Sequence, residues 1–464
     1  MSAIQENPSS LHLKSVIAAL WTGNLFAPFL MSGVAAILPS IGESLGASAV
    51  ALSLVMVCYN LGQSISHMLS GRVADIFGVK RTLLLGVGCF CLFCACMGLA
   101  PAMGVLIPLR FAQGVAAATI SCAVTTLSVT LAPANIRGQV ISIVVSAVYL
   151  GLAIGPLACG GISELCGWRS VFFMIAALGV VEWALLRYVI PELPREGARR
   201  SFDMPSALLG AGGLVCMTMG ATCTFLHPAV AALLPVGLAL LAAFVHREWT
   251  SSDPMLDLKL LAKVPGLPDG MAATFINYGS FMGLSLFFSL YLQQVLGLNA
   301  FHAGMVLMIQ SLFQTVFSPL AGKLADRYQP GIVSTSGMAA CGVSILSLML
   351  LGEHSPVWQV ALSQAVLGTG AAFFAAPNMA ATLGNVPRDE MSVASGLLGC
   401  LRTMGGLMSH IIMSCTIGLF MGDTAVTPES SGMFLHAMRY ALLLFGLLNL
   451  LGVLLSLRAL RHHR

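Results

Sequence analysis

Five polar side chains stand inside long apolar runs of this sequence, where a charge or an unpaired hydrogen-bonding group is costly. Arg110 and Gln113 are three residues apart, so they share one face if their run is helical. Glu182, His67 and His410 each lie within another apolar run. An ionisable group inside a membrane segment is a functional candidate by default, and histidine titrates near neutral pH. These five residues are therefore candidates for proton coupling.

Each candidate also has a structural interpretation, which stays open at this point. Arg110 lies about two turns from the end of its run, from which a long side chain can reach the membrane surface. Glu182 precedes Arg187 by little more than one turn, so the two can form an ion pair. His67 and His410 can be satisfied by local hydrogen bonds.

The composition indicates a membrane protein. Only 9% of the 464 residues are charged, against about 25% in soluble proteins. Apolar residues make up 57%, and the mean hydropathy is +0.90. Alternating segments of a β-barrel are not seen. The net charge of +4 does not predict nucleic-acid binding, since most Lys and Arg lie at expected cytoplasmic segments. We predict an all-α polytopic membrane protein.

Fourteen transmembrane helices are predicted. Their approximate ranges are 15–38, 48–70, 82–100, 104–131, 140–163, 170–190, 205–225, 229–246, 268–293, 302–321, 332–351, 358–383, 392–418 and 435–457. An even number places both termini on one side of the membrane. Arg458, Arg461 and Arg464 predict that this side is the cytoplasm.

A short charged segment occurs twice. GRVADIFGVKR, from Gly71 to Arg81, returns as GKLADRYQP, from Gly322 to Pro330. Each copy lies between two membrane-length runs, so we expect two homologous six-helix bundles. The second copy follows the tenth run rather than the eighth, which places two additional helices between the bundles. The predicted domains are therefore 1–190, a linker with two helices at 191–267, and 268–464.

The residue types of the charged segment suit a loop between two helices. Gly71 permits close backbone approach, and Asp75 can oppose the positive end of a helix dipole. Basic side chains can pair with acids of a moving neighbour. The alternative is that the charges only set topology. We expect a conformational latch, formed by Gly71, Arg72, Asp75, Arg81, Gly322 and Asp326.

The fifth predicted run is rich in small residues, and the third contains a group of cysteines. The small residues are Gly151, Gly155, Pro156, Gly160 and Gly161. Such a face lets two helices meet backbone to backbone, and the proline should bend the helix. The cysteines, Cys89 to Cys96 among 13 in the chain, point to different faces of a helix. We expect them to pack as small apolar groups, with no metal site.

Together these motifs resemble the major facilitator superfamily, and within it the fourteen-helix drug:proton antiporters. The resemblance spans the first to the last predicted helix. GRVADIFGVKR is similar to the superfamily's signature loop, Arg110-Phe-Ala-Gln113-Gly114 to a motif linked to proton transfer, and Gly151 to Gly161 to the antiporter motif. The resemblance implies two bundles that rock about a central cavity, with the two additional helices outside them.

The chain departs from that family in its first helix. The fourteen-helix branch usually carries an acid and an asparagine there, but this sequence has Leu30 and Ala35 in the same frame. The second signature segment also has Gln329 in place of a glycine. Without the usual acid, Arg110 and Arg402 favour neutral or anionic ligands over lipophilic cations.

Polar residues of the central helices are the candidates for lining a substrate cavity. They are Asn24, Tyr59, Gln63, Asn277, Tyr278, Gln310, Gln314 and Arg402. Asn277 and Tyr278 are equally compatible with packing contacts between helices.

The functional hypothesis is a proton-driven exporter of amphipathic organic compounds or drugs. The alternative is a specific exporter of a metabolite or an organic anion with the same fold. A membrane enzyme or a receptor is less consistent, because no catalytic pattern and no soluble output domain are evident. We expect no cofactor besides the proton gradient. The partners should be a small-molecule substrate and the lipid bilayer, with the protein a monomer in the inner membrane.

Cysteine labelling tests the topology. Single cysteines placed at Lys259 and Arg388 should react only with reagent on the cytoplasmic side, because both follow the positive-inside pattern. Single cysteines at Glu43 and Glu353 should react only from outside. A cysteine-free parent, with the 13 native cysteines replaced, is the control for background labelling. Labelling of the two termini from opposite sides would contradict fourteen helices.

Overall fold

The computed structural model describes residues 10–133, 136–192, 203–225, 227–251, 254, 256, 258–384, 386–387, 390–422 and 424–462. Within them, fourteen helical segments are long and apolar enough to cross a membrane. This confirms the predicted number of spans and the all-α polytopic fold.

The helices fall into a first group, a pair and a second group. The first group is α1 (Ser10–Gly23), α2 (Phe26–Leu45), α3 (Ala49–Phe77), α4 (Val79–Gly98), α5 (Met103–Leu131), α6 (Arg137–Cys166) and α7 (Trp168–Val189). The pair is α8 (Met204–Thr222) and α9 (Leu233–Thr250), joined by the short helices η1 (Cys223–Phe225) and η2 (Pro228–Ala232).

The second group follows a short connecting helix, α10 (Lys259–Lys263). It comprises α11 (Leu267–Phe281), α12 (Leu284–Leu290), η3 (Tyr291–Val295), α13 (Ala300–Arg327), α14 (Pro330–Ser347), η4 (Leu348–Leu350), α15 (Val357–Leu383), α16 (Met391–Met421), η5 (Pro428–Ser430) and α17 (Ser431–His462).

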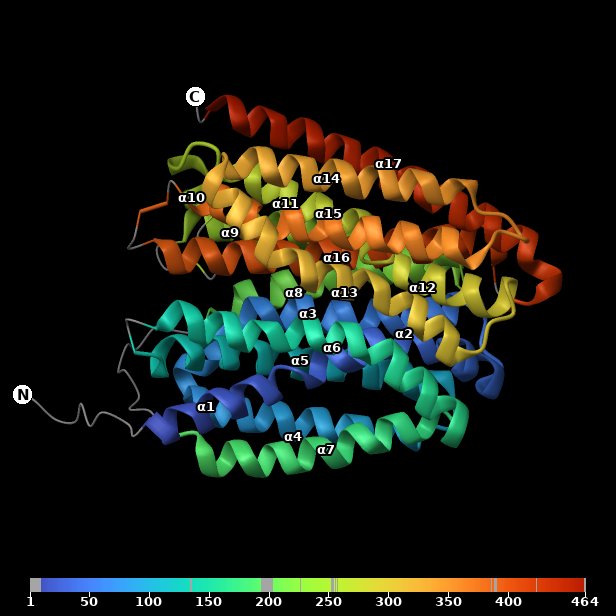
Figure 1. The fold of residues 1–464 in the computed structure, drawn as a ribbon, viewed down its shortest axis with the longest axis horizontal. Helices are drawn as coiled ribbons and strands as arrows, with labels where there is room; N and C mark the ends of the chain where they lie inside the picture. The colour runs from blue at the N-terminus through green and yellow to red at the C-terminus, as the bar shows by residue number, and fades with distance from the viewer. Residues whose placement is uncertain are drawn as a thin grey trace, which may run out of the picture.

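The two groups lie side by side with their long helices roughly parallel (Figure 1). They meet along two seams, one between α6 and α13 and the other between α3 and α16. α1 begins and α17 ends on the same side of the molecule, at the left of Figure 1. We call this the terminal side, and the other the opposite side.

The first span is longer than predicted and is interrupted. It runs from Leu13 to Leu45 rather than from 15 to 38, and it changes from α1 to α2 at Asn24 and Leu25. Leu25 donates its backbone N–H to Thr22 O at 3.0 Å, three residues back, so the regular α-helical ladder is broken there. Asn24 therefore lies at the break between α1 and α2.

The charged segments are helical, which corrects the prediction of loops. α3 continues to Phe77 and α13 to Arg327, so Gly71 to Phe77 and Gly322 to Arg327 extend the spans before them. Only Gly78 separates α3 from α4, and its φ of 90° ends the helix in a conformation that glycine adopts readily. Alanine, arginine and leucine favour helix, so local propensity does not require a loop.

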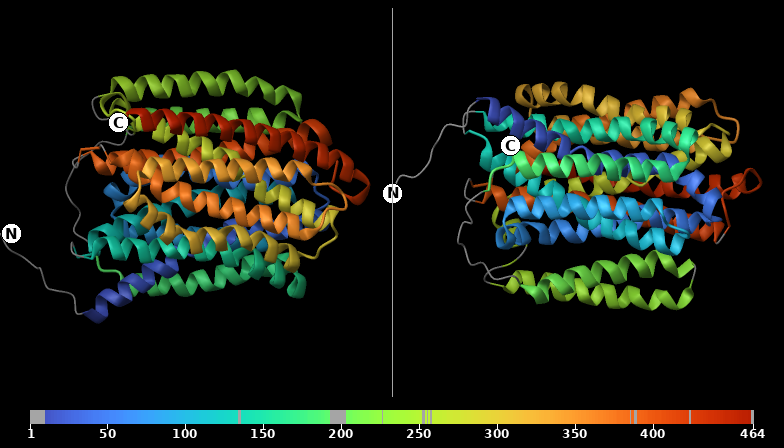
Figure 2. Two further views of the ribbon diagram at one scale, coloured as in Figure 1. Left: turned by 45° about the horizontal axis from the view of Figure 1, so that its top comes forward. Right: turned by 90° about the horizontal axis from the view of Figure 1, so that it is seen from below.

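The α8–α9 pair covers the α3–α16 seam. Leu214 and Phe244 of the pair pack in one apolar cluster with Leu61 of α3 and Leu407 of α16. Gly213 and Gly237 let the backbones of α8 and α9 come close to each other. Figure 2 shows the pair at the edge of the molecule, lying alongside both groups.

Asp203 links α8 to α9 at their terminal-side ends. Its carboxylate caps α8 by accepting the Ser206 N–H at 3.4 Å and the Ser206 hydroxyl at 2.9 Å. The same carboxylate accepts two hydrogen bonds from the guanidinium of Arg247 in α9, at 2.9 and 3.1 Å. The Arg247 guanidinium holds the pKa of Asp203 below its usual range.

Substitutions of Asp203 separate the cap from the ion pair. Asn caps helices about as well as Asp, so Asp203→Asn removes mainly the charge facing Arg247. Its apparent melting temperature in detergent should fall slightly, because exposed ion pairs contribute roughly 0–1 kcal/mol. Asp203→Ala should cost about 1 kcal/mol more through the lost cap.

The pH dependence of that melting temperature follows from the lowered pKa of Asp203. A carboxylate with a lowered pKa stabilises the fold above its ordinary range, and the contribution disappears as pH falls through the lowered pKa. The difference between wild type and Asp203→Asn should therefore vanish in acid. A difference that persists unchanged at low pH would contradict this account.

Candidate functional site

A fully buried cation, Arg110, forms the centre of the candidate site. Its Nη1 donates to Gln113 Oε1 at 2.5 Å, and its Nε donates to Val55 O on α3 at 3.4 Å. The guanidinium stacks over the Tyr59 ring, with 4.5 Å between Cζ and the ring centroid. Gln113 in turn donates to Cys94 Sγ at 3.1 Å. The predicted shared face of Arg110 and Gln113 is confirmed, and Arg110 does not reach the membrane surface.

No carboxylate among the described residues is paired with this cation. Arg110 Nη2 and the Tyr59 hydroxyl are both buried and lack a hydrogen-bond partner among the described residues. A buried charge stabilised by an aromatic face, an amide and one carbonyl is only partly compensated. The cluster therefore keeps free hydrogen-bonding capacity inside the membrane span.

His410 lies in the second group, on α16, which packs against α3 at the second seam. It is fully buried in α16, and its Nδ1 lies 2.7 Å from Gly406 O. Its Nε2 has no partner among the described residues. The charge of Arg110 acts on His410 across the α3–α16 seam. Arg110 and His410, which lie 300 positions apart in the sequence, are thus carried by two helices that both pack against α3.

A second cluster lies toward the terminal side of the two seams. The Arg402 guanidinium is 6.0 Å from the centroid of the Tyr278 ring. Its charge acts on His67 of α3 and on Tyr149 of α6. Tyr149 is absent from the predicted site, because an isolated tyrosine in a glycine-rich helix carries no local signal.

Glu182 stands apart from both clusters. It is 4% exposed and faces the α1–α2 break, where a methyl group added at Gly23 would lie 3.2 Å from its Oε1. That oxygen has no hydrogen-bond partner among the described residues. Arg187 is exposed and forms no ion pair with Glu182. The structural alternative of a Glu182–Arg187 pair is therefore wrong, since the two side chains leave α7 on different faces.

The other predicted cavity residues are dispersed. Asn24 donates to Val144 O on α6 at 3.0 Å, which ties the α1–α2 break to α6. Asn277 is 1% exposed, and its Oδ1 has no partner among the described residues. Gln63 and Gln310 are half-buried, and Gln314 is buried. Their role as substrate contacts stays a prediction.

The glycine run of α6 brings backbones together on two sides. Gly151 and Gly155 face the backbone of α2, where a methyl group at Gly151 would lie 2.8 Å from Leu25 O. Gly160 faces Ala300 of α13, and Gly304 of α13 faces Pro156 of α6. Gly161 packs beside the Phe301 ring. The expected close packing is confirmed, and α6 continues through Pro156.

Hydrogen bonds between the two groups, where the described residues form them, lie on the opposite side. Ser53 and Ser414 share a bond of 2.7 Å, Gln293 donates to Ala36 O at 2.8 Å, and Gln294 donates to Glu43 at 3.0 Å. Further bonds join Ser289 to Ala35 O, Phe301 N to Glu164 and Ala49 N to Thr424 O. The sequence does not reveal these residues, because each bond joins positions more than 100 residues apart.

The predicted latch residues fall at the terminal side. Gly71, Arg72 and Asp75 lie in the last turns of α3, but their side chains are outside the described part of the structure. Arg81 and Asp326 are exposed, and a methyl group at Gly322 would meet nothing within 4 Å. Their role as a latch stays a prediction.

Gly160→Ala tests the backbone contact at the α6–α13 seam. The added methyl group would clash with Ala300 O, so we expect the closed opposite side to be destabilised by about 1–3 kcal/mol. A cysteine at Ser53, buried in this state, should then become accessible to a thiol reagent from that side. Gly104→Ala is the matched control, because no atom lies within 4 Å of its added methyl group. Equal accessibility in both variants would contradict the contact's role.

Comparisons with known proteins agree with this architecture. The chain is 27% identical over 407 residues to the multidrug resistance protein Stp of Mycobacterium tuberculosis, covering 86% of this chain and 74% of that protein. It is 29% identical over 418 residues to the puromycin resistance protein pur8 of Streptomyces alboniger, covering 85% and 80%.

A solved structure and a family profile extend the likeness to nearly the whole chain. The crystal structure of a bacterial homolog to the human lysosomal transporter Spinster, in an inward-facing and unoccupied conformation, has the same fold. The TM-score is 0.71 at 15% identity, over 98% of each chain. The profile of the Major Facilitator Superfamily matches residues 20–248 and 270–464, so the chain, a multi-pass membrane protein, belongs to that superfamily of transporters.

Proposed function

We propose that this protein exports amphipathic organic compounds, including drugs, in exchange for protons across the inner membrane. Relatives named for multidrug and puromycin resistance support the substrate class. The observation that carries the proposal is the buried Arg110 cluster, which packs against α3, the helix that α16 with His410 contacts at the seam. A charge without a paired carboxylate is expensive to bury, and such groups in membranes belong to ion pathways. In this proposal the protein is not an enzyme.

The proposed cycle moves two domains, residues 1–190 and 268–464, with the linker and additional helices at 191–267 beside them. The terminal side is taken as cytoplasmic, with both termini there. The cross-seam hydrogen bonds on the opposite side then correspond to a closed outer face. Export requires those bonds to break while the backbone contacts between α6 and α13 change.

Proton coupling is assigned to the polar groups at the seams. Leu30 and Ala35, at the positions of the family's usual acid and asparagine, are each 1% exposed and packed in the main apolar core. They offer no site for a proton. We assign the coupling to Arg110, Gln113 and His410, because free hydrogen-bonding capacity remains at Arg110 Nη2 and at His410 Nε2. The proton gradient is the energy source, and no cofactor enters the cycle.

The same electrostatics set the expected substrate charge. Arg110 and Arg402 both carry positive charge near the seams, and Tyr278 offers Arg402 an aromatic face. A cationic ligand would meet like charge without a paired acid, whereas a neutral or anionic amphiphile would not. This favours the second candidate function, a specific exporter of an organic anion, as a narrower form of the same activity. The protein should act as a monomer.

Transport in proteoliposomes tests coupling and charge preference together. Matched cationic, neutral and anionic amphiphiles are compared in counterflow and under an imposed pH gradient. We expect neutral or anionic compounds to be exported faster than cations. Arg110→Ala should abolish pH-driven exchange, because it removes the buried charge to which the coupling is assigned.

Two variants serve as controls for this experiment. Arg110→Lys keeps the charge but loses the planar donor fork, so partial activity is expected. Leu30→Asp places an acid at the family's usual position and should raise transport of cations. If a monovalent cation is the best substrate of the wild type and Arg110→Ala transports normally, the proposal is wrong.

A further inference from the structure

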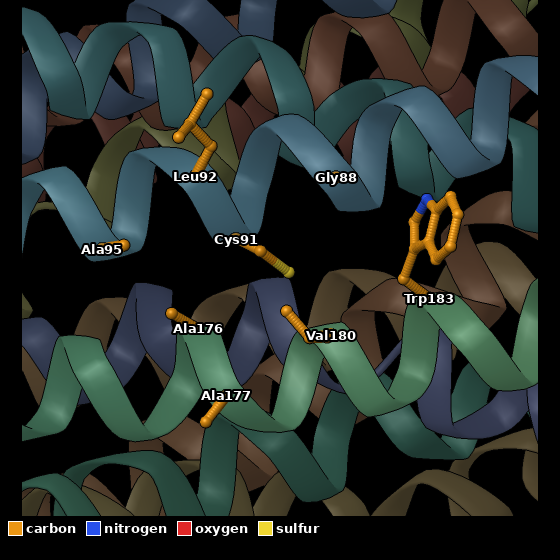
Figure 3. A pocket seen from close by; sticks show the side chains of 8 residues that line it. All are labelled: Gly88, Cys91, Leu92, Ala95, Ala176, Ala177, Val180 and Trp183. Atoms are coloured by element: carbon orange, nitrogen blue, oxygen red, sulfur yellow. The ribbon is translucent and has the colours of Figure 1, made fainter.

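An apolar groove runs between α4 and α7, away from both seams. Its volume is about 450 Å³. Gly88 and Ala95 of α4 form one wall, Ala176 and Ala177 of α7 form the other, and Trp183 stands at one end (Figure 3). None of these residues belongs to the candidate transport site, so the groove needs its own explanation.

The shape of the groove is fixed by contacts beneath and beside it. The buried Cys91 side chain occupies the space left by the missing side chain of Gly179, which brings α4 and α7 together under the groove. The Trp183 indole donates its N–H to Leu84 O on α4 at 3.0 Å. The indole is therefore held across the end of the groove with its only polar atom satisfied, which leaves an apolar surface.

The groove opens toward the lipid. α4 and α7 lie at the outer edge of the first group (Figure 1). The rim residues Leu92 and Val180 are 59% and 60% exposed, and both belong to membrane-crossing segments. The surrounding medium at this depth is the acyl region of a bilayer.

Two arginines stand at the terminal-side end of the same surface. Arg81 precedes Gly88 by seven residues in α4, and Arg187 follows Trp183 by four residues in α7. Those spacings keep each arginine on the helix face that lines the groove. Both side chains are exposed, and neither forms an ion pair with a described residue. The apolar groove therefore leads to two exposed cations that form no ion pair with a described residue.

The distance from the arginines to the far end of the groove matches one lipid leaflet. Arg187 and Ala176 are eleven residues apart in α7, which is about 16 Å along a helix axis. Half of a bilayer's hydrocarbon core is about 15 Å thick. A ligand with a negative head at the arginines would thus place an acyl chain along the whole groove.

We propose that this groove binds one anionic phospholipid from the terminal-side leaflet. The acyl chain lies between α4 and α7 against Trp183, and the phosphate accepts hydrogen bonds from Arg81 and Arg187. Guanidinium groups match phosphate oxygens in a forked geometry, which zwitterionic lipids satisfy less well because their own ammonium group competes.

Quenching of Trp183 fluorescence by brominated lipids tests the proposal in proteoliposomes of the full chain. Phosphatidylglycerol with brominated acyl chains is diluted into phosphatidylcholine, and brominated phosphatidylcholine is compared at the same mole fraction with unbrominated phosphatidylglycerol present. The Trp183 contribution is the difference between the wild type and Trp183→Phe, since the chain has five tryptophans. We expect brominated phosphatidylglycerol to quench Trp183 more strongly.

Three variants identify the parts of the site. Arg187→Gln should reduce the preference for phosphatidylglycerol about fivefold, the effect of one basic residue at a membrane surface. Arg458→Gln, which removes an exposed arginine at the end of α17, should leave the preference unchanged. Ala177→Phe fills the groove and should reduce quenching by either lipid. Equal quenching by the two lipids in the wild type would overturn the proposal.

A second measurement keeps the test independent of the tryptophan substitution. In detergent, added phosphatidylglycerol should raise the melting temperature of the wild type more than phosphatidylcholine does, and Arg187→Gln should lose that difference. Glycerol phosphate, which lacks the acyl chains, should have no effect. A rise that Arg187→Gln retains in full would place the lipid elsewhere and contradict the assignment.

Discussion

The contact on which the architecture depends is made by backbone atoms. At the α6–α13 seam, Gly160 faces the carbonyl of Ala300, and Gly304 faces the carbonyl of Pro156. Side chains cannot enter these positions, so the two helix groups approach as closely as their backbones allow. In lipid, where apolar side chains gain little by leaving the solvent, such packing is a main source of helix association. The hydrogen bonds of the opposite side are placed by this close approach.

The polar groups on the helices that pack against α3 obey a different constraint. Arg110 is buried with one amide, one carbonyl and one aromatic face as partners, and His410 keeps one ring nitrogen free. Burying an ionisable group costs desolvation free energy unless neighbouring groups compensate its charge. The helices that pack against α3 therefore retain buried hydrogen-bonding groups without a partner among the described residues, at Arg110 Nη2 and His410 Nε2. In the proposed function these polar groups respond to a proton or a ligand, while the backbone contacts of the α6–α13 seam hold the two helix groups together.

Much of this could be predicted from local sequence, and the remainder depends on tertiary structure. The number of spans, the shared face of Arg110 and Gln113 and the packing role of the α6 glycines all follow from hydropathy and helical spacing. The charged segments were predicted as loops because charge is typical of loops, yet their residues are compatible with helix and α3 ends only at Gly78. The packing of α16, which carries His410, against α3 joins helices of the two groups, and no local pattern contains it.

The α8–α9 pair has a consequence for how the molecule meets its surroundings. A duplicated chain would present two equivalent lateral entrances, one at each seam. The pair packs over the α3–α16 seam through Leu214 and Phe244, while the α6–α13 seam has no such cover in the described structure. The α8–α9 pair, which lies outside the two helix groups, thus makes the two seams unequal. A hydrophobic compound diffusing within the bilayer meets the covered α3–α16 seam on one side and the uncovered α6–α13 seam on the other. Its two lateral approaches to the protein are therefore not equivalent.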